Sequence, residues 1–303
     1  MIRLAIIIPC FQNEGSIPAL CERLLQLRER LHNLVSVKFV FVNDGSTDRT
    51  LDGLLSFQQK HPIDIKVINL TRNFGSYNAL LIGMEHAEAD CHVHLHADLQ
   101  DPPELIDEMF QYWLGGEKLV LAYRNQREDG SLFSSLYHLL VKHFAISNIP
   151  PGGFDLVLFD EQIRQEVVLI SEKNTNIVYL ITWLGYPYKA IPYERKKRES
   201  GVSQWHFSKK VRLFFDTIFS FTDLPRKIVY LLASLSFVIA FLTIVSAFII
   251  HLDKPLSLNT WLIILLFFTI SLLSVIGAIL SEYLVRIHET VRKRPNTVIE
   301  RIY

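Results

Sequence analysis

Three polar loops carry the side chains whose types and spacing suit chemistry, and the first is His96-Ala-Asp-Leu-Gln-Asp-Pro-Pro-Glu104. It follows an apolar run, and carboxylates in such a place serve as ligands for hard divalent cations or accept hydrogen bonds from sugar hydroxyl groups. Asp101, followed by two prolines and then Glu104, fits the N-cap of a helix. Asp98 is not needed for that cap, and burying its carboxylate without a partner would be costly. We therefore regard Asp98 as the candidate ligand.

The second and third loops are Asn43-Asp-Gly-Ser-Thr-Asp48 and Phe11-Gln-Asn-Glu14, and each of them also follows an apolar run. The loop Asn43–Asp48 alone is equally well explained by an Asx turn and a helix cap. Helix capping alone, however, does not explain why acidic or amide residues follow three different strands, whereas a shared binding site does. We therefore predict that the three loops meet in one polar site.

The elements that position these loops alternate between short apolar runs and amphipathic stretches. Strands are predicted at Leu4–Ile8, Val37–Val42, Ile65–Leu70, Cys91–His96 and Leu119–Ala122, and helices at Ser16–Leu31, Asp48–Gln59, Ser76–Glu88 and Pro103–Leu114. Continuous runs rich in Ile and Val are typical of buried parallel strands, so the pattern predicts a doubly wound α/β sheet. Ligands of such sheets bind beyond the carboxyl ends of the strands, where the polar loops lie.

The pattern changes after about residue 131. Ser131–Ile146 and Gln162–Ile170 have helical spacing, and Tyr186–Tyr193 is a candidate edge strand because its prolines are tolerated only at a sheet edge. The stretch Trp205–Phe221 interleaves basic and aromatic residues, which predicts amphipathic helices lying in a membrane interface. A solvated basic face is the alternative interpretation.

Two segments without any charged residue, Ile228–Ile250 and Pro255–Ser281, follow this stretch. Each exceeds the roughly 20 residues that a helix needs to cross a bilayer, so we predict a transmembrane hairpin, with a pair of buried core helices as the alternative. Basic residues flank the hairpin on its outer ends, which predicts that both termini are cytoplasmic. The expected organisation is a cytoplasmic domain over 1–205, interfacial helices over 206–226, a hairpin over 227–287 (spans about 228–250 and 258–281) and a cytoplasmic tail over 288–303.

Composition excludes several classes of protein. The 303 residues carry 31 basic and 31 acidic side chains, and this zero net charge argues against binding of nucleic acid through bulk positive charge. Half of the residues are hydrophobic, which excludes a disordered chain. The three cysteines, Cys10, Cys21 and Cys91, form no C-x-x-C pair, so we expect a reducing compartment, no disulfide framework and no zinc site.

Several motifs, in their order and spacing, carry a resemblance to a known family. They are Ile8-Pro-Cys-Phe-Gln-Asn-Glu14, Val42-Asn-Asp-Gly-Ser-Thr-Asp48, Arg72-Asn-Phe-Gly75, Ala97-Asp-Leu-Gln-Asp-Pro-Pro-Glu104, Tyr123-Arg124 with Arg127, Tyr193-Glu-Arg-Lys-Lys-Arg-Glu-Ser-Gly-Val-Ser203 and Ser220-Phe-Thr-Asp-Leu-Pro-Arg226. Over nearly its whole length the chain resembles family 2 glycosyltransferases of the GT-A fold, and among them the polyprenyl-phosphate glycosyltransferases. This resemblance implies a mostly parallel central sheet.

The resemblance also implies roles for individual residues. The nucleotide-sugar donor would be held by Pro9, Phe11, Glu14, Asn43, Asp44, His96, Ala97, Asp98 and Gln100. Asp98 and Gln100 would bind Mg²⁺ or Mn²⁺ on the donor diphosphate. The catalytic set would contact the lipid phosphate and the donor. Its members are Asp98, Arg124, Arg127, Arg195, Arg198 and Ser203.

The implied reaction is an inverting transfer of a sugar, favoured from a UDP-sugar, to a polyprenyl phosphate such as undecaprenyl phosphate. The implied setting is a bacterial inner membrane, with membrane lipid as a partner, a homo-oligomer (a tetramer in relatives) and no nucleic acid. A phosphate nucleophile is largely ionised at neutral pH, because the second pKa of a phosphate monoester is near ~6, and so it needs no general base. Arginines then supply bidentate contacts to phosphate.

The chain departs from the family pattern at four positions. His96 stands where the family usually has the first Asp of Asp-x-Asp, Asn43 stands for a common Asp, and Gln204 and Ser76 stand for usual lysines. His96 is expected to accept a hydroxyl proton, to bind metal or to pack. Two alternatives to the lipid-linked reaction stay open: a catalytically silent homologue that acts as a membrane scaffold, and a transferase with a non-lipid glycan acceptor.

Overall fold

The computed structural model describes residues 1–61, 64–124, 150, 154, 156–170, 176–194, 231, 258–291 and 297–303. The chain forms two compact units. Met1–Thr217 together with Pro295–Tyr303 make the first unit, and Ile218–Arg294 make the second. The N-terminal and C-terminal ends of the chain therefore belong to the same unit.

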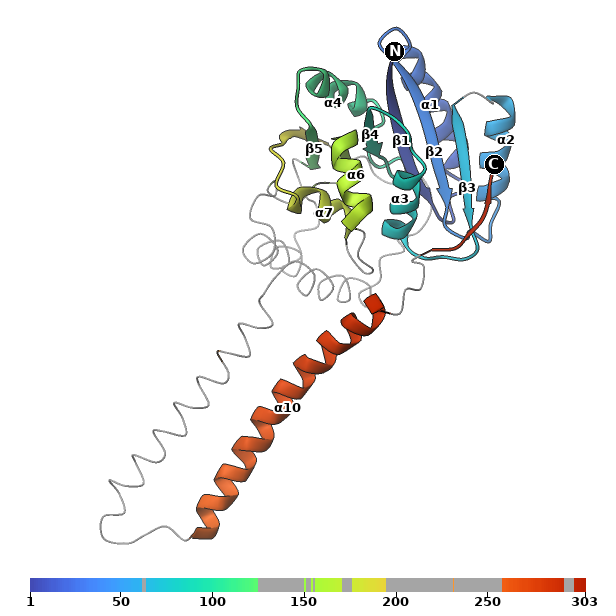
Figure 1. Ribbon diagram of the computed structural model, residues 1–303. Coiled ribbons are helices and arrows are strands. Elements are labelled where there is room, and N and C mark those ends of the chain that lie inside the picture. The colour runs from blue at the N-terminus through green and yellow to red at the C-terminus, as the bar shows by residue number, and fades with distance from the viewer. Residues whose placement is uncertain are drawn as a thin grey trace. The chain divides into compact units, whose positions relative to one another are not determined.

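The first unit is built on an eight-stranded sheet with the strand order β7-β5-β6-β4-β1-β2-β3-β8 (Figure 1). Its strands are β1 (Ile2–Cys10), β2 (Val35–Asn43), β3 (Ile65–Leu70), β4 (Cys91–His94), β5 (Leu119–Arg124), β6 (Leu156–Asp160), β7 (Lys189–Tyr193) and β8 (Ile299–Ile302). β1 pairs in parallel with β2 and β4, and β2 with β3. β6 runs antiparallel to both of its neighbours, and β8 runs antiparallel to β3. The sheet is therefore mixed: four of its seven strand pairs are parallel, as expected of a mostly parallel sheet, and β6 and β8 are the two strands that run the other way.

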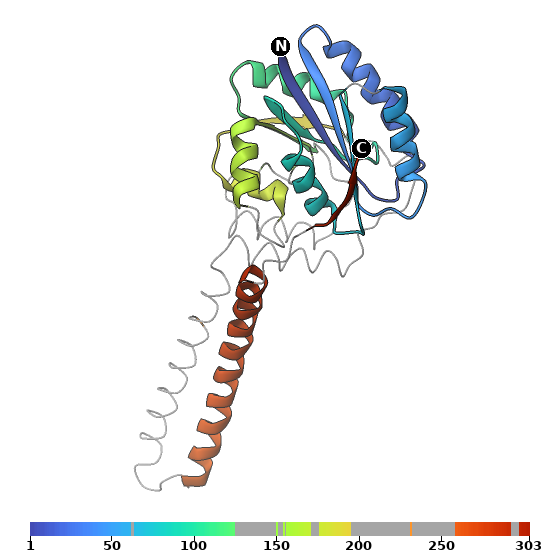
Figure 2. The same cartoon turned by 45° about the vertical axis from the view of Figure 1, so that its right-hand side comes forward.

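Helices cover both faces of the sheet, as Figure 2 shows. They are α1 (Ile17–Leu31), α2 (Thr50–Lys60), α3 (Ser76–Glu85), α4 (Leu105–Leu114), α6 (Glu161–Ile170) and α7 (Ile177–Trp183). α1, α2 and α4 pack on one face, while α3 and α6 pack on the other with α7 beside them. In β1, Leu4 to Ile8 are fully buried, because successive side chains point to opposite faces and both faces are covered.

Close packing on the second face depends on a glycine. A Cβ atom added to Gly83 of α3 would lie 2.3 Å from Cγ2 of Ile7 in β1. Only a glycine lets the helix approach the central strand this closely. On the opposite face α1 places Leu20, Leu24 and Leu27 against the sheet at helical spacing, and all three are fully buried.

The five predicted strands of residues 1–124 are confirmed as β1 to β5, and the four predicted helices as α1 to α4, with ends shifted by up to three residues. Gln162–Ile170 is confirmed as α6. The candidate edge strand is confirmed as β7, the first strand of the sheet order, with Pro192 inside it. The predicted helix Ser131–Ile146 lies outside the described residues.

Strand β8 was not anticipated, because residues 288–303 were assigned to a tail. Ile299–Ile302 adds to the outer edge of β3 and closes that side of the sheet. The backbone N–H of Tyr303 donates to the carbonyl of Val67 at 2.8 Å, and Thr71 N–H donates to Val298 at 3.1 Å. An edge strand with unpaired backbone groups is thus covered by the chain's own C-terminal segment.

The described part of the second unit is α10 (Leu258–Val291), a helix of 34 residues. Across the parts of the chain that the structure describes, no helix combines the length and apolar character needed to cross a membrane. The predicted first span at about 228–250 lies, except for Leu231, outside the described residues, as do the predicted interfacial helices over 206–226. The predicted second span at about 258–281 lies within α10, and the structure gives it no support as a membrane-crossing helix, so the hairpin stays a prediction.

Candidate functional site

One edge of the sheet gathers the predicted site residues that the structure describes. β1 to β5 and β7 all run in the same direction, because β6 is antiparallel to both β4 and β5 and β7 is parallel to β5. The carboxyl ends of these strands therefore share one edge, the edge at which α/β sheets bind ligands. Pro9 and Phe11 lie there at the end of β1, Asn43 and Asp44 at the end of β2, His96 to Gln100 beyond β4, and Arg124 at the end of β5.

Hydrogen bonds join the loop after β1 to the loop after β2. The backbone N–H of Gln12 donates to Oγ of Ser46 at 3.1 Å, and that of Glu14 donates to Oδ2 of Asp48 at 3.1 Å. In return, Oε2 of Glu14 accepts from the backbone N–H of Arg49 at 3.0 Å. Glu14, predicted to hold the donor, therefore also fastens its loop to the start of α2.

The segment after β1 also contacts the loop after β4. Oγ of Ser16 donates to the carbonyl oxygen of Ala97 at 2.8 Å. The three loops singled out in the sequence therefore form one connected region, and Ser16, which sequence reasoning did not single out, links two of them. A serine just before a helix is normally assigned to capping, yet here the side chain makes no cap hydrogen bond to α1.

Asp98 and Gln100 flank a strained residue. Leu99 between them has a φ of 58°, a left-handed conformation that is uncommon for a leucine, and its side chain is buried. The backbone N–H of Gln100 donates to Oδ1 of Asp98 at 3.3 Å. Burial of Leu99 holds the turn, and the turn leaves Asp98 and Gln100 half-buried on either side of it.

This pair fits a divalent cation that is shared with a substrate. Among the described residues, no group of three or more His, Cys, Asp or Glu side chains could enclose a metal ion. Mg²⁺, however, is normally held by one or two carboxylates together with water and substrate phosphates rather than by a cage of protein ligands. One carboxylate from Asp98 and one amide oxygen from Gln100 supply such a partial set.

His96 packs against a second histidine. Its ring lies edge-on to the ring of His94, with the ring centroids 4.5 Å apart. Burial, together with the nearby His96, holds the pKa of His94 well below its usual value. The packing role expected as one option for His96 is thus observed, while its roles toward a hydroxyl group or a metal stay predictions.

Asp44 fastens the loop after β3. Its two carboxylate oxygens accept from the backbone N–H groups of Phe74 and Gly75, at 2.7 and 2.9 Å. Burial raises the pKa of Asp44, and these two hydrogen bonds partly offset the effect. The next residue, Gly45, has a φ of 63°, and a Cβ there would lie 2.3 Å from the backbone of Arg72. The Asn-Asp-Gly segment therefore fixes the Arg72–Gly75 motif in place.

Asn43 contacts a neighbouring amide on β3. Its Nδ2 donates to Oδ1 of Asn69 at 2.7 Å, and both side chains are buried. Oδ1 of Asn43 is buried too and has no hydrogen-bond partner among the described residues. Sequence reasoning missed Asn69, because a single Asn at the end of an apolar strand gives no signal.

The structure also gives the positions of Asp101 and Arg124. Asp101 is not the N-cap of α4, because that helix begins at Leu105 with Glu104 at the N-cap position. The carboxylate of Asp101 is instead fully buried and accepts from the Tyr193 hydroxyl group. Arg124 is half-buried at the end of β5, in register with Tyr193 on β7. The remaining predicted site residues, Arg127, Arg195, Arg198 and Ser203, lie outside the described residues.

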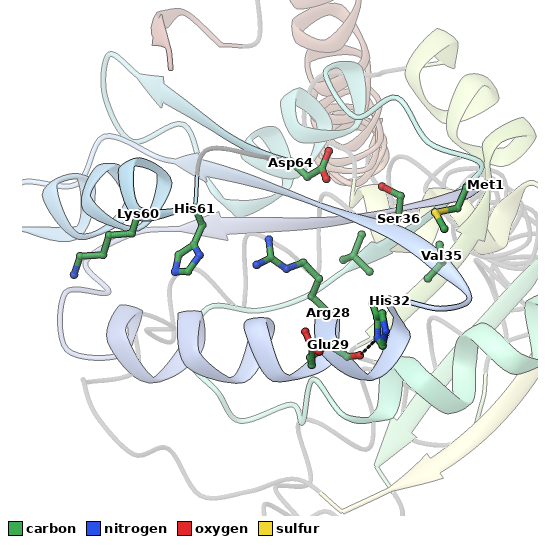
Figure 3. Close-up of a pocket in the computed structure, with 10 residues that line it drawn as sticks. Met1, Arg28, Glu29, His32, Val35, Ser36, Lys60, His61 and Asp64 are labelled. Atoms are coloured by element: carbon green, nitrogen blue, oxygen red, sulfur yellow. Dashed lines mark hydrogen bonds between the residues drawn. The ribbon is translucent and has the colours of Figure 1, made fainter.

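A cavity of about 490 Å³ lies at the opposite edge of the sheet (Figure 3). Met1 and Val35, at the starts of β1 and β2, line it, as do Arg28 of α1 and His32, which follows that helix. Since parallel α/β sheets bind their ligands at the carboxyl ends of the strands, we do not assign the candidate site to this cavity.

Comparison with known proteins places the chain in a family. Residues 5–212 match the model of glycosyl transferase family 2. An uncharacterized glycosyltransferase of Synechocystis sp. is 31% identical over 302 residues, which cover 97% of this chain and 93% of that protein.

Two relatives carry more specific names. The SfII prophage-derived bactoprenol glucosyl transferase of Shigella flexneri is 27% identical over 99% of this chain and 98% of its own length. A prophage bactoprenol glucosyl transferase homolog of Escherichia coli is 29% identical over 99% of both chains. Among solved structures, a mannosyltransferase of Pyrobaculum calidifontis in complex with GDP-Man and Mn²⁺ is 19% identical over 63% of this chain and 55% of its own, at a TM-score of 0.46. The match over residues 5–212 and the likeness over almost the whole chain make this protein a member of glycosyltransferase family 2.

Proposed function

We propose that this protein transfers a sugar from a nucleotide-sugar donor to a membrane polyprenyl phosphate. The observation that carries the proposal is the likeness to bactoprenol glucosyl transferases, which spans 99% of this chain and 98% of the relative. Bactoprenol is a polyprenol, and the match includes the apolar C-terminal segments as well as the glycosyltransferase domain. UDP-glucose is therefore the first donor to test, with undecaprenyl phosphate as the acceptor.

The donor would bind at the connected loops beyond β1, β2 and β4. Asn43 and Phe11 would contact the nucleoside, with Pro9, Ala97 and His96 beside them, while Asp98 and Gln100 would hold Mg²⁺ or Mn²⁺ against the diphosphate. When bound there, the ion supplies a positive charge that stabilises the departing diphosphate. Glu14 and Asp44 would contact the donor as well, and their carboxylates also hold the loops by accepting backbone N–H groups.

The reaction balances without a general base. An oxygen of the lipid phosphate forms a bond to the anomeric carbon of the sugar, and the bond from that carbon to the diphosphate oxygen breaks. The nucleoside diphosphate leaves with the electron pair, and attack opposite the leaving group inverts the anomeric centre. The chain therefore has to position two anions and reduce their repulsion, a task suited to Arg124 and, outside the described residues, to Arg127, Arg195, Arg198 and Ser203.

The lipid acceptor gives the C-terminal part of the chain a role. We assign residues 1–205 to the catalytic domain, residues 206–226 to the membrane interface and residues 227–287 to a transmembrane hairpin, with residues 288–303 following it. The domain and both termini would lie on the cytoplasmic side of a bacterial inner membrane, where donor and lipid phosphate meet. Assembly as a homo-oligomer is part of the same proposal.

The test uses the full chain purified in detergent and incubated with radiolabelled UDP-glucose, undecaprenyl phosphate and Mg²⁺. Label is expected in the organic phase, in a product that mild acid hydrolyses to free glucose, as glycosyl phosphates require. A panel of other UDP- and GDP-sugars runs in parallel. Label that enters only the aqueous phase as free glucose, with every donor, would contradict transfer to lipid.

Two other results would favour the alternatives. Binding of nucleotide with no transfer from any donor would favour a catalytically silent scaffold, for which the replacement of an Asp by His96 is the supporting observation. Transfer to an added glycan in the absence of lipid would favour a non-lipid acceptor.

A further inference from the structure

Three polar side chains form a line across the edge of the sheet, from the C-terminal strand to the proposed nucleotide site. Oε2 of Glu300 on β8 accepts from Nδ2 of Asn69 on β3, at 2.5 Å. Oδ1 of Asn69 accepts from Nδ2 of Asn43 on β2, at 2.7 Å. Glu300 and Asn69 are 231 positions apart in the sequence, so only pairing of β8 with β3 brings them together.

The chemistry of Glu300 fixes the direction of every hydrogen bond in this line. An ionised carboxylate can only accept, so the Asn69 amide has to turn its NH₂ group toward Glu300. The side-chain oxygen of Asn69 then faces Asn43, which donates a hydrogen bond to it from its own NH₂ group. The free end of the line is therefore Oδ1 of Asn43, an acceptor.

The local backbone is built for this contact. Asn69 pairs with Arg301, but Leu70 pairs with Ile299, so the register shifts and Glu300 is the extra residue of a β-bulge. A bulge redirects a side chain that a regular ladder would place elsewhere, and bulges are frequent next to functional sites. Glu300 itself is exposed, while Asn69 and Asn43 are buried.

The free acceptor lies where a nucleotide would bind. Asn43 is the last residue of β2, at the carboxyl edge of the sheet, and its Oδ1 is buried with no donor among the described residues. A buried polar atom without a partner is costly and calls for an explanation. An N–H group of a ligand would satisfy it once the neighbouring side chains shift, as side chains at binding sites commonly do on binding.

We infer that Glu300 and Asn69 are positioning residues that make Asn43 present a hydrogen-bond acceptor to the base of the donor nucleotide. The inference rests on the proposed function, because it assumes a nucleotide donor at this edge. The line selects bases with an imino N–H, such as uracil or guanine. It also gives the C-terminal strand a part in donor recognition.

The test reverses the direction of the line. In Glu300→Lys the new ammonium group can only donate, so Asn69 should turn its oxygen outward and Asn43 should present NH₂. Glu300→Asp keeps a carboxylate, and Glu300→Gln permits either direction. Glu29→Lys, on the exposed surface of α1, makes the same change of charge at the opposite edge of the sheet.

Binding is measured by calorimetry with the full-length protein in detergent and Mg²⁺, first with UDP and GDP. The affinity for the nucleotide that binds more tightly is then compared with the affinity for its analogue methylated at the imino nitrogen (N3 of uracil or N1 of guanine). For wild type, Glu300→Asp and Glu29→Lys we expect methylation to weaken binding about tenfold or more, the value of one hydrogen bond. For Glu300→Lys we expect the unmodified nucleotide to bind about tenfold more weakly, with little further loss on methylation.

The comparison separates a positioning role from a structural one. Damage to the fold would weaken the binding of the unmodified nucleotide and of its methylated analogue by the same factor. Equal loss for both, or no loss for Glu300→Lys, would overturn the inference while leaving lipid glycosylation intact. Failure of wild type to bind either nucleotide would overturn the proposed function and this inference with it.

Discussion

The hydroxyl group of Tyr193 donates a hydrogen bond of 2.5 Å to Oδ1 of Asp101, and both side chains are buried. Tyr193 ends β7, whereas Asp101 lies just beyond the Asp98–Gln100 turn, 92 positions earlier in the sequence. The bond therefore joins the proposed metal-binding loop to the last described strand before the basic segment that starts at residue 195. A change at Tyr193 should therefore affect both the proposed metal-binding loop and β7.

Replacing Tyr193 by Phe tests this connection. Tyr193→Phe keeps the ring but removes a donor to a buried carboxylate, so we expect the free energy of unfolding to fall by about 1–3 kcal/mol. The midpoint of urea denaturation of the full chain in detergent measures the loss. Tyr112→Phe is the matched control, because Tyr112 is a half-buried ring under the ammonium group of Lys189, and the change leaves the ring in place. A midpoint equal to that of the control would show that the hydrogen bond adds nothing.

The central strands could be predicted from the sequence because burial on both faces leaves a signal in the residue types. β1 contains the uninterrupted apolar run Leu4–Ile8 and β2 the run Phe39–Val42, and each strand ends within two residues of its predicted ends. β8 leaves no such signal, since Ile299–Ile302 lies at an edge, is mostly exposed and contains Glu300 and Arg301. Its partner, β3, is far away in the sequence, and pairing of that kind is set by the tertiary fold.

The candidate site was predictable to the level of its loops and not to the level of its contacts. The loops were visible because polar residues follow apolar strands. The partners of Asp44 could not be predicted, because every residue type except proline has a backbone N–H group and the sequence does not show which of them donates. Asp101 illustrates the same limit, since a sequence that suits a helix cap also suits a buried carboxylate bound to a distant tyrosine.

Gly45 should be irreplaceable. A Cβ there would lie 2.3 Å from the backbone of Arg72, and the φ of 63° is itself unfavourable for alanine. We expect Gly45→Ala to lower the free energy of unfolding by at least about 2 kcal/mol and to weaken nucleotide binding, because the Arg72–Gly75 loop must move.

Gly116→Ala is the control for backbone strain alone. Gly116 has a φ of 100°, but no atom lies within 4 Å of the added Cβ. We expect a loss of about 1–2 kcal/mol from the conformation alone, with unchanged nucleotide binding. Equal effects of the two substitutions on both measurements would refute the steric role of Gly45.

Stability should fall when the pH drops below the usual pKa of histidine, and His92 is one cause. Burial lowers the pKa of His92 from 6.5 to about 4, although Glu161 lies 3.4 Å from its Nε2. Between these two values the unfolded chain binds a proton that the folded chain does not, so stability rises with pH in this range. One such group contributes a slope of up to about 1.4 kcal/mol per pH unit.

His92→Phe should reduce this slope, since it removes the titrating group and keeps an aromatic ring against Phe159. Urea denaturation between pH 4 and 6.5 measures the effect, and part of the slope should persist because burial also lowers the pKa of His94. His32→Gln, at the exposed residue that follows α1, is the control. An unchanged slope in His92→Phe would mean that this ring is not the source.

Asp98 should be required for turnover and dispensable for folding. Its side chain is half-buried beside a turn that the buried Leu99 holds in place, so Asp98→Asn should leave the free energy of unfolding within about 1 kcal/mol of wild type. If the carboxylate holds the divalent ion against the diphosphate, its loss should lower kcat by roughly 100-fold or more, since such charge stabilisation is worth several kcal/mol. Titration with Mn²⁺ in the presence of nucleoside diphosphate should show weaker ion binding. Glu108→Gln, which removes an exposed carboxylate from α4, should change neither quantity. Wild-type turnover in Asp98→Asn would place the ion, and with it the leaving group, somewhere other than beyond β4.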